Sequence, residues 1–207
     1  MEVYLIRHGE TLWNTEKRLQ GRTDIELNEN GRALAYATRD RLAELKVDRM
    51  YSSPLRRAYE TADIIRGTRN IDIVTDDRLK EICFGSNEGC KSEVILKDEN
   101  NPFRFFFTHP ELYYAPKGGE SIEEIMERGK QFMQQVVEPE ADKLERIMIV
   151  AHGAINKAIM CYVKNHGKDK LWKGNLQKNC GVIIFDYSPH NDGNGYKMIN
   201  EGTVFWK

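Results

Sequence analysis

At 207 residues the chain is long enough to enclose one sizeable hydrophobic core and too long for a miniprotein held together by disulfides. Its 31 Lys and Arg residues nearly balance 32 Asp and Glu residues, for a formal net charge of -1. Nucleic-acid binding and membrane-surface binding both favour a basic excess, so the composition argues against either as the main activity. A local basic pocket inside a neutral total stays open.

The N-terminal residues and the cysteines indicate a cytoplasmic protein. Residues 1–5 run directly into a short apolar segment, without the basic start and long apolar stretch of a secretory signal. No run approaches the ~20 apolar residues that a membrane span requires, so we expect no membrane partner. Cys83, Cys90, Cys161 and Cys180 are widely spaced and none lies at metal-ligand spacing. We expect idle, reduced thiols and no metal site.

In the first part of the chain, short apolar runs alternate with helical periodicity. Runs rich in strand formers predict buried strands, and apolar positions at three- and four-residue intervals predict amphipathic helices. The predicted elements are, in chain order, a strand at 3–6, a helix at 32–45, a strand near 50–51, a helix at 56–66 capped by Ser53 or Pro54, and a strand at 71–74.

The second part begins with the least regular segment, residues 87–109. Its four phenylalanines, Phe103 and 105–107, favour packing in a core or lid over direct ligand contact. Ser121 and Glu124 form a capping-box pattern at the start of a helix reaching toward 137, and Pro139 ends or kinks that helix. The remaining predictions are a strand at 146–151, a helix to about 163, and two or three short strands within 181–206 around a turn at 191–195.

This alternation of strands and helices predicts an α/β sheet flanked by helices. We see no interdomain linker, repeat or low-complexity tract, so we expect a single domain over residues 1–207. Residues 87–117 would form a variable lid or insertion in it. The sequence leaves the oligomeric state open, and an exposed part of the phenylalanine cluster would offer a homodimer interface.

Two histidine-glycine pairs follow the two most apolar predicted strands. In open α/β sheets, ligands bind beyond the carboxyl ends of the strands, where His8-Gly9 and His152-Gly153 are expected. Arg7 precedes the first pair, and the planar fork of arginine suits two oxygens of a phosphate. Glycine would let backbone amides approach the same anion. The pattern therefore predicts an anion site with two histidines.

A further arginine and a glutamate are weaker candidates when each is considered alone. Arg56 and Arg57 lie at the start of a predicted helix, where the helix dipole favours an anion, but arginines there are usually solvated. Glu81 follows a connecting segment, and an isolated glutamate is ordinarily exposed.

Four groups of residues recur in order over most of the chain. They are Arg7-His8-Gly9-Glu10-Thr11 with Trp13-Asn14, Gln20-Gly21-Arg22-Thr23-Asp24, Leu27 and Gly31; then Ser53, Leu55, Arg57, Ala58, Thr61 and Ala62; then Leu79, Glu81, Gly85, Glu88 and Gly89; and last Ala151-His152-Gly153. This ordered set resembles the motifs of the histidine phosphatase superfamily, the phosphoglycerate-mutase-like enzymes. The resemblance implies a three-layer α/β/α sandwich with a mixed, largely parallel sheet.

The resemblance also implies a role for each matching residue. His8 would be the nucleophile that takes the phosphoryl group, and Glu81 the proton donor, kept protonated beside an anionic substrate. No metal ion and no cofactor would be needed, because positive side chains stabilise the transferring group. Arg7, Arg57 and His152 would complete the catalytic phosphate pocket, and Asn14, Gln20, Gly21, Thr23 and Gly153 would bind phosphate or substrate.

Two departures bear on the activity. Asn87 stands where many relatives carry tryptophan, and the long basic insertion of cofactor-dependent phosphoglycerate mutases is missing. The chain therefore resembles the broad-specificity and α-ribazole-type phosphatases more than the glycolytic mutases. We expect a phosphomonoester hydrolase acting on a small phosphorylated metabolite. A mutase-type phosphotransferase and a non-catalytic phospholigand-binding module stay open as alternatives.

Overall fold

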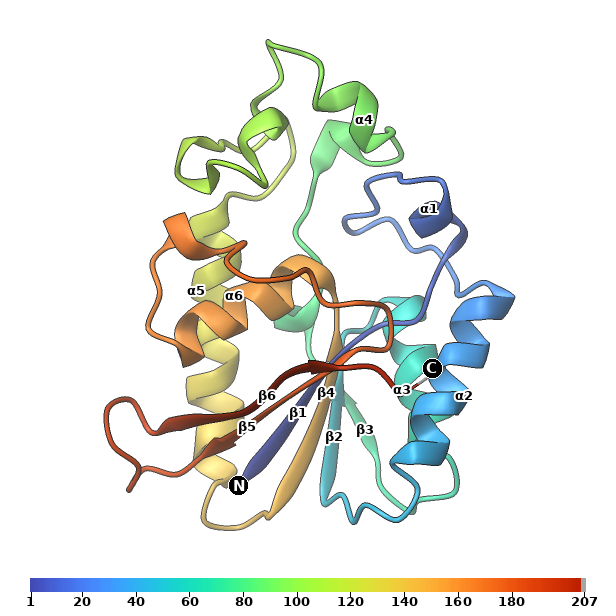
Figure 1. Cartoon of the computed structure of the whole chain (residues 1–207), viewed down its shortest axis with the longest axis vertical. Coiled ribbons are helices and arrows are strands. Elements are labelled where there is room, and N and C mark those ends of the chain that lie inside the picture. Colours follow the sequence, from blue (N-terminus) through green and yellow to red (C-terminus); the bar gives the residue numbers. More distant parts are fainter. Residues whose placement is uncertain (206–207) are drawn as a thin grey trace.

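The computed structural model describes residues 1–205, and its centre is one six-stranded sheet (Figure 1). Along the sheet the strands follow the order β3-β2-β4-β1-β5-β6. The first four in this order run parallel, β5 is antiparallel to β1, and β6 is antiparallel to β5, which confirms the mixed, largely parallel α/β fold. The bounds are β1 (Glu2–Arg7), β2 (Arg49–Ser52), β3 (Ile73–Thr75), β4 (Arg146–Ala151), β5 (Val182–Tyr187) and β6 (Tyr196–Thr203).

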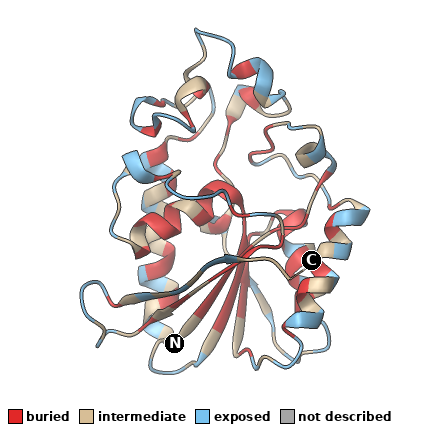
Figure 2. Ribbon diagram, in the orientation of Figure 1, coloured by how far each residue is buried: buried red, intermediate tan, exposed pale blue. Residues whose placement is uncertain are grey.

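The two central strands are buried on both faces because helices cover each side of the sheet (Figure 2). Side chains alternate along each strand, so Val3 and Leu5 enter one apolar cluster while Tyr4 and Ile6 enter the other. Helix α3 (Arg56–Arg66) contributes to the second cluster, together with Leu42 just beyond α2 (Glu29–Arg41). Helices α5 (Ile122–Phe132) and α6 (Gly153–Val163) contribute to the first. The sheet is therefore the middle of three layers.

Several helix ends differ from the predicted ones. Helix α2 ends at Arg41, so Leu45 lies beyond it. The residue that caps α3 is Leu55, whose amide donates to Ser53 Oγ at 3.3 Å, so the prediction of Ser53 or Pro54 as the cap is wrong. Ser121 does form the predicted capping box, but α5 ends at Phe132 and continues as the π-helix η5 (Met133–Val137) and the 3₁₀-helix η6 (Glu138–Glu140), which contains Pro139.

Short elements stand above the carboxyl ends of the parallel strands (Figure 1). Within this region the rings of Phe103 and Phe106 stack with centroids 5.0 Å apart, and both side chains are buried. This confirms the predicted packing role for those two, whereas Phe107 is 39% exposed. The elements here are α1 (Leu12–Thr15), α4 (Ser92–Ile95), η2 (Gly85–Asn87), η3 (Pro102–Phe105) and η4 (Pro110–Leu112), while η1 (Asp77–Leu79) and η7 (Lys168–Lys170) lie in other connections.

The end of the chain forms the antiparallel pair β5 and β6 around residues 191–195, as predicted. Trp206, the last residue of the predicted strand region, lies outside the described residues. Among residues 1–205, no helix has both the length and the apolar character needed to cross a membrane.

Candidate active site

The sheet brings three separate chain segments together at the carboxyl ends of β2, β4 and β1. Arg7 pairs with Ala151 and Ser52 with Val150, so the residues that follow these strands are neighbours. The amide of His8 donates to the carbonyl of Ala151 at 2.9 Å. The two predicted histidines are thereby adjacent, with the ring centroids of His8 and His152 5.1 Å apart.

The His8 ring is buried, and one of its nitrogens is held by its own backbone. Nδ1 lies 2.6 Å from the carbonyl oxygen of Gly9. A carbonyl can only accept, so Nδ1 carries the proton and Nε2 keeps its lone pair. Burial lowers the pKa of His8 well below its ordinary value, and the nearby charges of Arg57 and Arg7 lower it further. The ring is consequently a neutral base at physiological pH.

The loop that carries His8 is fixed by side chains from distant segments. The amide of Gly9 donates to Thr61 Oγ1 at 2.9 Å, and the Asn179 side chain donates to the carbonyls of His8 and Gly9 at 3.0 and 3.1 Å. A Cβ atom at Gly9 would meet the Gly31 carbonyl oxygen at 2.6 Å. The missing side chain of Gly9 therefore allows close packing against Gly31, while its amide is bonded to Thr61.

The His152 ring is held by Ser53, the residue that follows β2. Its Nε2 lies 2.8 Å from Ser53 Oγ, while its buried Nδ1 has no hydrogen-bond partner in the described chain. Burial lowers the pKa of His152 well below its ordinary value, and the charge of Arg57 lowers it further. The second ring is thus also neutral.

Two arginines, the buried Arg57 and the half-buried Arg7, supply the positive charge. Arg57 donates to the carbonyls of Gly21 and Thr23 at 2.7 and 2.8 Å, and Arg7 donates to the carbonyl of Gln177 at 2.6 Å. Burial lowers the pKa of Arg57 to about 10, which leaves it charged at neutral pH. Both Nε atoms are buried and lack a partner within residues 1–205. Unpaired buried donors on charged groups are a binding opportunity for an anion such as phosphate.

Glu81 lies beside this cluster at the start of α6. Its carboxylate accepts from the backbone amides of Ala154 and Ile155 at 3.1 and 3.2 Å. A Cβ atom built on Gly153 would be 3.6 Å from Glu81 Oε2 and 3.8 Å from Arg7 Nε. Glu81 and Arg7 therefore face the same first turn of the helix.

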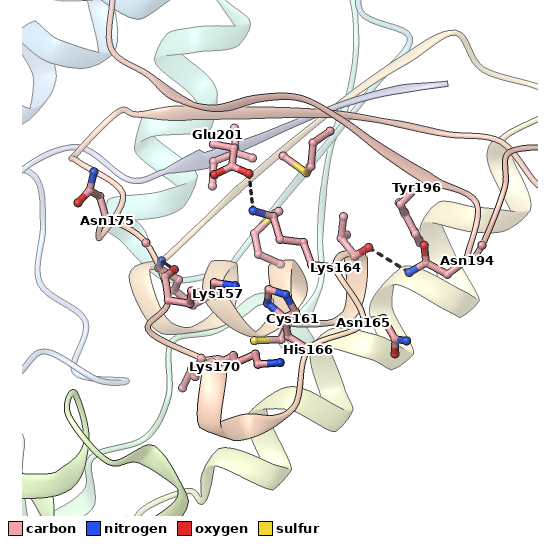
Figure 3. A pocket seen from close by; sticks show the side chains of 18 residues that line it. Lys157, Cys161, Lys164, Asn165, His166, Lys170, Asn175, Asn194, Tyr196 and Glu201 are labelled. Atoms are coloured by element: carbon pink, nitrogen blue, oxygen red, sulfur yellow. Dashed lines mark hydrogen bonds and ion pairs between the residues drawn. The ribbon is translucent and has the colours of Figure 1, made fainter.

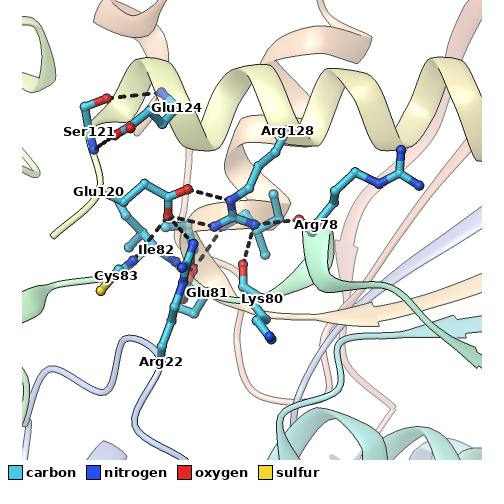
Figure 4. A network of polar contacts seen from close by, with 12 residues as sticks. Arg22, Arg78, Lys80, Glu81, Ile82, Cys83, Glu120, Ser121, Glu124 and Arg128 are labelled. Atoms are coloured by element: carbon cyan, nitrogen blue, oxygen red, sulfur yellow. Dashed lines mark hydrogen bonds and ion pairs between the residues drawn. The ribbon is translucent and has the colours of Figure 1, made fainter. Parts of the chain in front are cut away.

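The segment that carries Glu81 is held by a buried ion pair that the sequence analysis did not identify (Figure 4). Arg128 on α5 pairs with Glu120 at 2.6 Å and donates to the carbonyls of Arg78 and Lys80, each at 2.5 Å. Glu120 in turn accepts from the amide of Cys83 at 3.2 Å. Sequence signals around Glu120 indicated only a helix start, since the backbone groups that this ion pair holds lie 37 to 50 residues before it.

A second carboxylate holds the predicted substrate loop. Glu88 accepts from the amides of Arg22 and Thr23, both at 2.9 Å, and from the Thr23 hydroxyl at 2.5 Å. Gly21 has φ +52°, and a Cβ atom there would lie 2.1 Å from Glu88 Oε1. Gln20 is buried nearby with an unpaired Oε1. Within the described chain, Thr23 and Gly21 thus serve the shape of the loop that receives Arg57.

The remaining predicted site residues have different surroundings. Asn14 accepts from the amide and hydroxyl of Thr11, both at 3.1 Å, in the cap of α1, and its side-chain nitrogen donates to no described residue. Gly153 is the first residue of α6. Asn87 exchanges two 3.3 Å hydrogen bonds with Asn101, which ties the start of the 87–117 segment to its middle.

Residues 3–200 match the family described as the histidine phosphatase superfamily (branch 1). Among curated proteins, the chain is 33% identical over 180 residues to putative phosphoserine phosphatase 2 of Hydrogenobacter thermophilus, covering 87% of this chain and 86% of that one. It is 31% identical over 190 residues to a probable phosphoglycerate mutase GpmB of Salmonella choleraesuis, covering 90% and 85%.

Solved structures share the same fold over almost the whole chain. Bacillus stearothermophilus YhfR is 36% identical with a TM-score of 0.88, covering 98% of this chain and 97% of that one. A phosphoserine phosphatase mutant from Entamoeba histolytica, in complex with phosphoserine, is 26% identical with a TM-score of 0.84, covering 98% and 97%. The protein therefore belongs to branch 1 of the histidine phosphatase superfamily. Within that superfamily it is a phosphatase.

Proposed function

We propose that the protein hydrolyses phosphomonoesters through a phosphohistidine formed on His8, with Glu81 as general acid and then general base. The observation that carries this proposal is the 2.6 Å contact between His8 Nδ1 and the Gly9 carbonyl. It leaves Nε2 as a neutral nucleophile beside the charges of Arg57 and Arg7. The positive charge that phosphoryl transfer requires would come from Arg7 and Arg57, so no metal ion is needed.

The proposed reaction has two displacements at phosphorus. His8 Nε2 attacks, the P–O bond to the leaving group breaks, and the leaving oxygen takes the proton of Glu81. Water then attacks the phosphohistidine, the P–N bond breaks, and Glu81 recovers a proton from that water. Its position against the first turn of α6 supports this dual role, since Ala154 and Ile155 keep the carboxyl group oriented in both steps.

A small phosphorylated metabolite is the proposed substrate. The Entamoeba histolytica relative was solved with phosphoserine, a compound of this class. The loop at Gln20–Thr23 and the 87–117 segment would form the walls that discriminate between substrates, because they lie above the carboxyl ends of the strands. We also propose that residues 1–207 act as one domain with 87–117 as its variable part, since all six strands share one sheet.

Replacement of the nucleophile tests the proposal. We expect His8→Ala to abolish both phosphate release and the acid-labile labelling of the protein by a ³²P-labelled phosphomonoester. His190→Ala, at an exposed histidine on a turn, is the matched control and should retain both. Residual turnover in His8→Ala, or labelling that resists acid, would contradict the covalent step.

The same assay separates hydrolysis from mutase activity. A hydrolase releases inorganic phosphate from the substrate under metal-chelated conditions. A mutase would interconvert phosphoglycerates when primed with a bisphosphorylated compound and would release little phosphate. The second result would replace hydrolysis with phosphotransfer while leaving the His8 step intact.

A further inference from the structure

A cavity of about 980 Å³ lies away from His8 and His152 (Figure 3). It is lined by the second half of α6, the loop that follows it, helix η7, and the hairpin of β5 and β6. None of the candidate catalytic residues lines it. Its volume is at the upper end of what small-molecule sites usually enclose, ~300 to 1,000 Å³.

The rim of this cavity is strongly positive in a chain that is nearly neutral overall. Four lysines face it against a single carboxylate, Glu201, which pairs with Lys164 at 2.6 Å. Lys157 donates to the backbone carbonyl of Lys173 at 2.8 Å, so it has no carboxylate partner among the described residues. Lys170 and Lys173 likewise make no ion pair within residues 1–205.

Burial and the positive charge lower the pKa values of two groups in the cavity, His166 and Lys157. Burial lowers the pKa of His166, and the charges of Lys173, Lys170 and Lys164 lower it further, against a smaller opposing effect of Asp169. Burial also lowers the pKa of Lys157, with a further contribution from Lys164. Positive charge in this cavity is therefore undercompensated by the protein, which favours the entry of an anion.

The floor of the cavity is apolar. Met160, Leu171 and Ile183 are buried there, and Tyr196 and Met198 of β6 complete the surface. An inorganic anion would contact only the lysines and leave these apolar side chains in contact with water. A ligand with an anionic head and an apolar body matches both parts.

We propose that this cavity binds a small organic anion, with a phosphate, sulfonate or carboxylate head at the lysines and an aromatic or aliphatic body on the apolar floor. The site lies against two elements that also reach the histidine cluster. Helix α6 begins with the amides that hold Glu81, and the chain from Lys173 continues to Gln177, whose carbonyl accepts from Arg7. The ligand would contact these elements without contacting the substrate.

The test uses 1-naphthalenesulfonate as the probe and the ring signals of the five histidines, recorded by NMR on ¹³C-histidine-labelled protein. We expect the His166 signal to shift with saturation, and its pKa to rise when the probe is bound. Any binding of the sulfonate near the catalytic arginines would instead perturb His8 and His152. An unchanged His166 signal, or one that moves only together with His8, overturns the proposal.

Two further arms test the head and the body separately. Neutral 1-naphthalenemethanol and inorganic sulfate should each bind more weakly than 1-naphthalenesulfonate. Binding of the alcohol equal to that of the sulfonate would contradict the role of the lysines. Binding of sulfate equal to that of the sulfonate would contradict the role of the floor.

Matched double variants place the site. Lys170→Gln with Lys173→Gln should weaken the probe about tenfold or more, because two charged donors are lost. Lys46→Gln with Lys143→Gln removes the same charge elsewhere and should leave the affinity within about twofold. Both variants should keep the circular dichroism and the phosphatase activity of the wild type. Equal affinities of the two double variants would overturn the proposal.

Discussion

Burial lowers the pKa values of the site residues, but it leaves the histidines neutral and the arginine charged. It keeps His8 and His152 neutral because a charged imidazole would lose hydration beside Arg57 and Arg7. The same burial lowers the pKa of Arg57 only to about 10, so its guanidinium stays charged. A neutral nucleophile beside fixed positive charge is the combination that attack on a phosphate dianion requires.

The neighbouring arginines Arg56 and Arg57 allow a matched comparison. Arg57 is buried against the Gly21 and Thr23 carbonyls, whereas Arg56 is exposed at the same helix start. We expect Arg57→Met to lower kcat/KM by roughly 10²- to 10³-fold, in line with the loss of one charge-stabilising donor. Arg57→Met should also raise the pKa of His8, measured by NMR of its ring. Arg56→Met should change neither by more than about twofold.

Glu81 offers a prediction on leaving groups. If it protonates the departing oxygen, Glu81→Gln should slow hydrolysis of alkyl phosphates far more than that of p-nitrophenyl phosphate, whose leaving group needs little protonation. Steady-state kcat on both substrates is the measurement. Glu44→Gln, at an exposed carboxylate outside the site, is the control. Equal losses on the two substrates would exclude Glu81 as the acid.

At the scale of elements, loops of the site are held by carboxylates from other loops. Glu88 receives the Arg22 and Thr23 amides, and Arg128 with Glu120 holds the chain on both sides of Glu81. Breaking the Arg128–Glu120 ion pair costs stability, because Glu120 is buried and keeps, within residues 1–205, only the exposed Arg22 as a charged partner. The geometry of the loops is therefore set by long-range polar contacts and not by their own turn preferences.

Arg128 tests whether this support matters for catalysis. Arg128→Met should lower the free energy of unfolding by about 3 kcal/mol, since Glu120 keeps only the exposed Arg22, at 3.4 Å, as a charged partner among the described residues. Because Arg128 acts through Glu81, kcat should fall more for alkyl phosphates than for p-nitrophenyl phosphate. Arg128→Lys should restore part of the kcat on alkyl phosphates. A loss of stability with equal kinetic effects on both substrates would reduce Arg128 to a structural role.

For the whole molecule, the two buried histidines link stability to pH. Their pKa values in the folded protein lie well below the ordinary 6.5, which the unfolded chain retains. Above pH 6.5 both states hold neutral rings, so the histidines contribute no pH dependence there. Below pH 6.5 the two histidines bind protons in the unfolded chain but not in the folded protein. The free energy of unfolding therefore falls as the pH falls from 6.5 toward the folded-state pKa values.

Urea unfolding at two pH values measures this effect. Between pH 6.5 and about 5.5, each histidine should remove about 1 kcal/mol of stability. The double variant His8→Asn, His152→Asn should lose roughly 2 kcal/mol less than the wild type over that interval, because the carboxylates are the same in both proteins. Parallel losses would mean that the histidines titrate alike in both states.

Local patterns were sufficient for the strands and for the placement of the two histidines. Residues 3–6 and 147–151 are continuous apolar runs, and both faces of their strands are covered, as such a composition predicts. Helix ends were less predictable. At α3, the N-cap is Leu55 because the Ser53 side chain contacts His152 instead of capping the helix in the usual way.

Order along the chain also carried information. The motifs that include Arg57 and Glu81 were recognisable by resemblance, although each residue alone looked like ordinary solvated surface. The structure brings Arg57 to the Gly21–Thr23 loop and Glu81 to the start of α6. Their roles in the reaction stay predictions until the variants above are measured.

The sequence by itself determined the alternation of elements, the family and the residue types at the strand ends, because these depend on local periodicity and on short ordered motifs. Only the tertiary structure decided how those residues are held. Gln177 and Asn179 reach Arg7 and His8 across about 170 residues, and Glu88 reaches the Thr23 amide across 65. Hydrogen bonds between such distant positions depend on the packed sheet and loops, so no local sequence pattern predicts them.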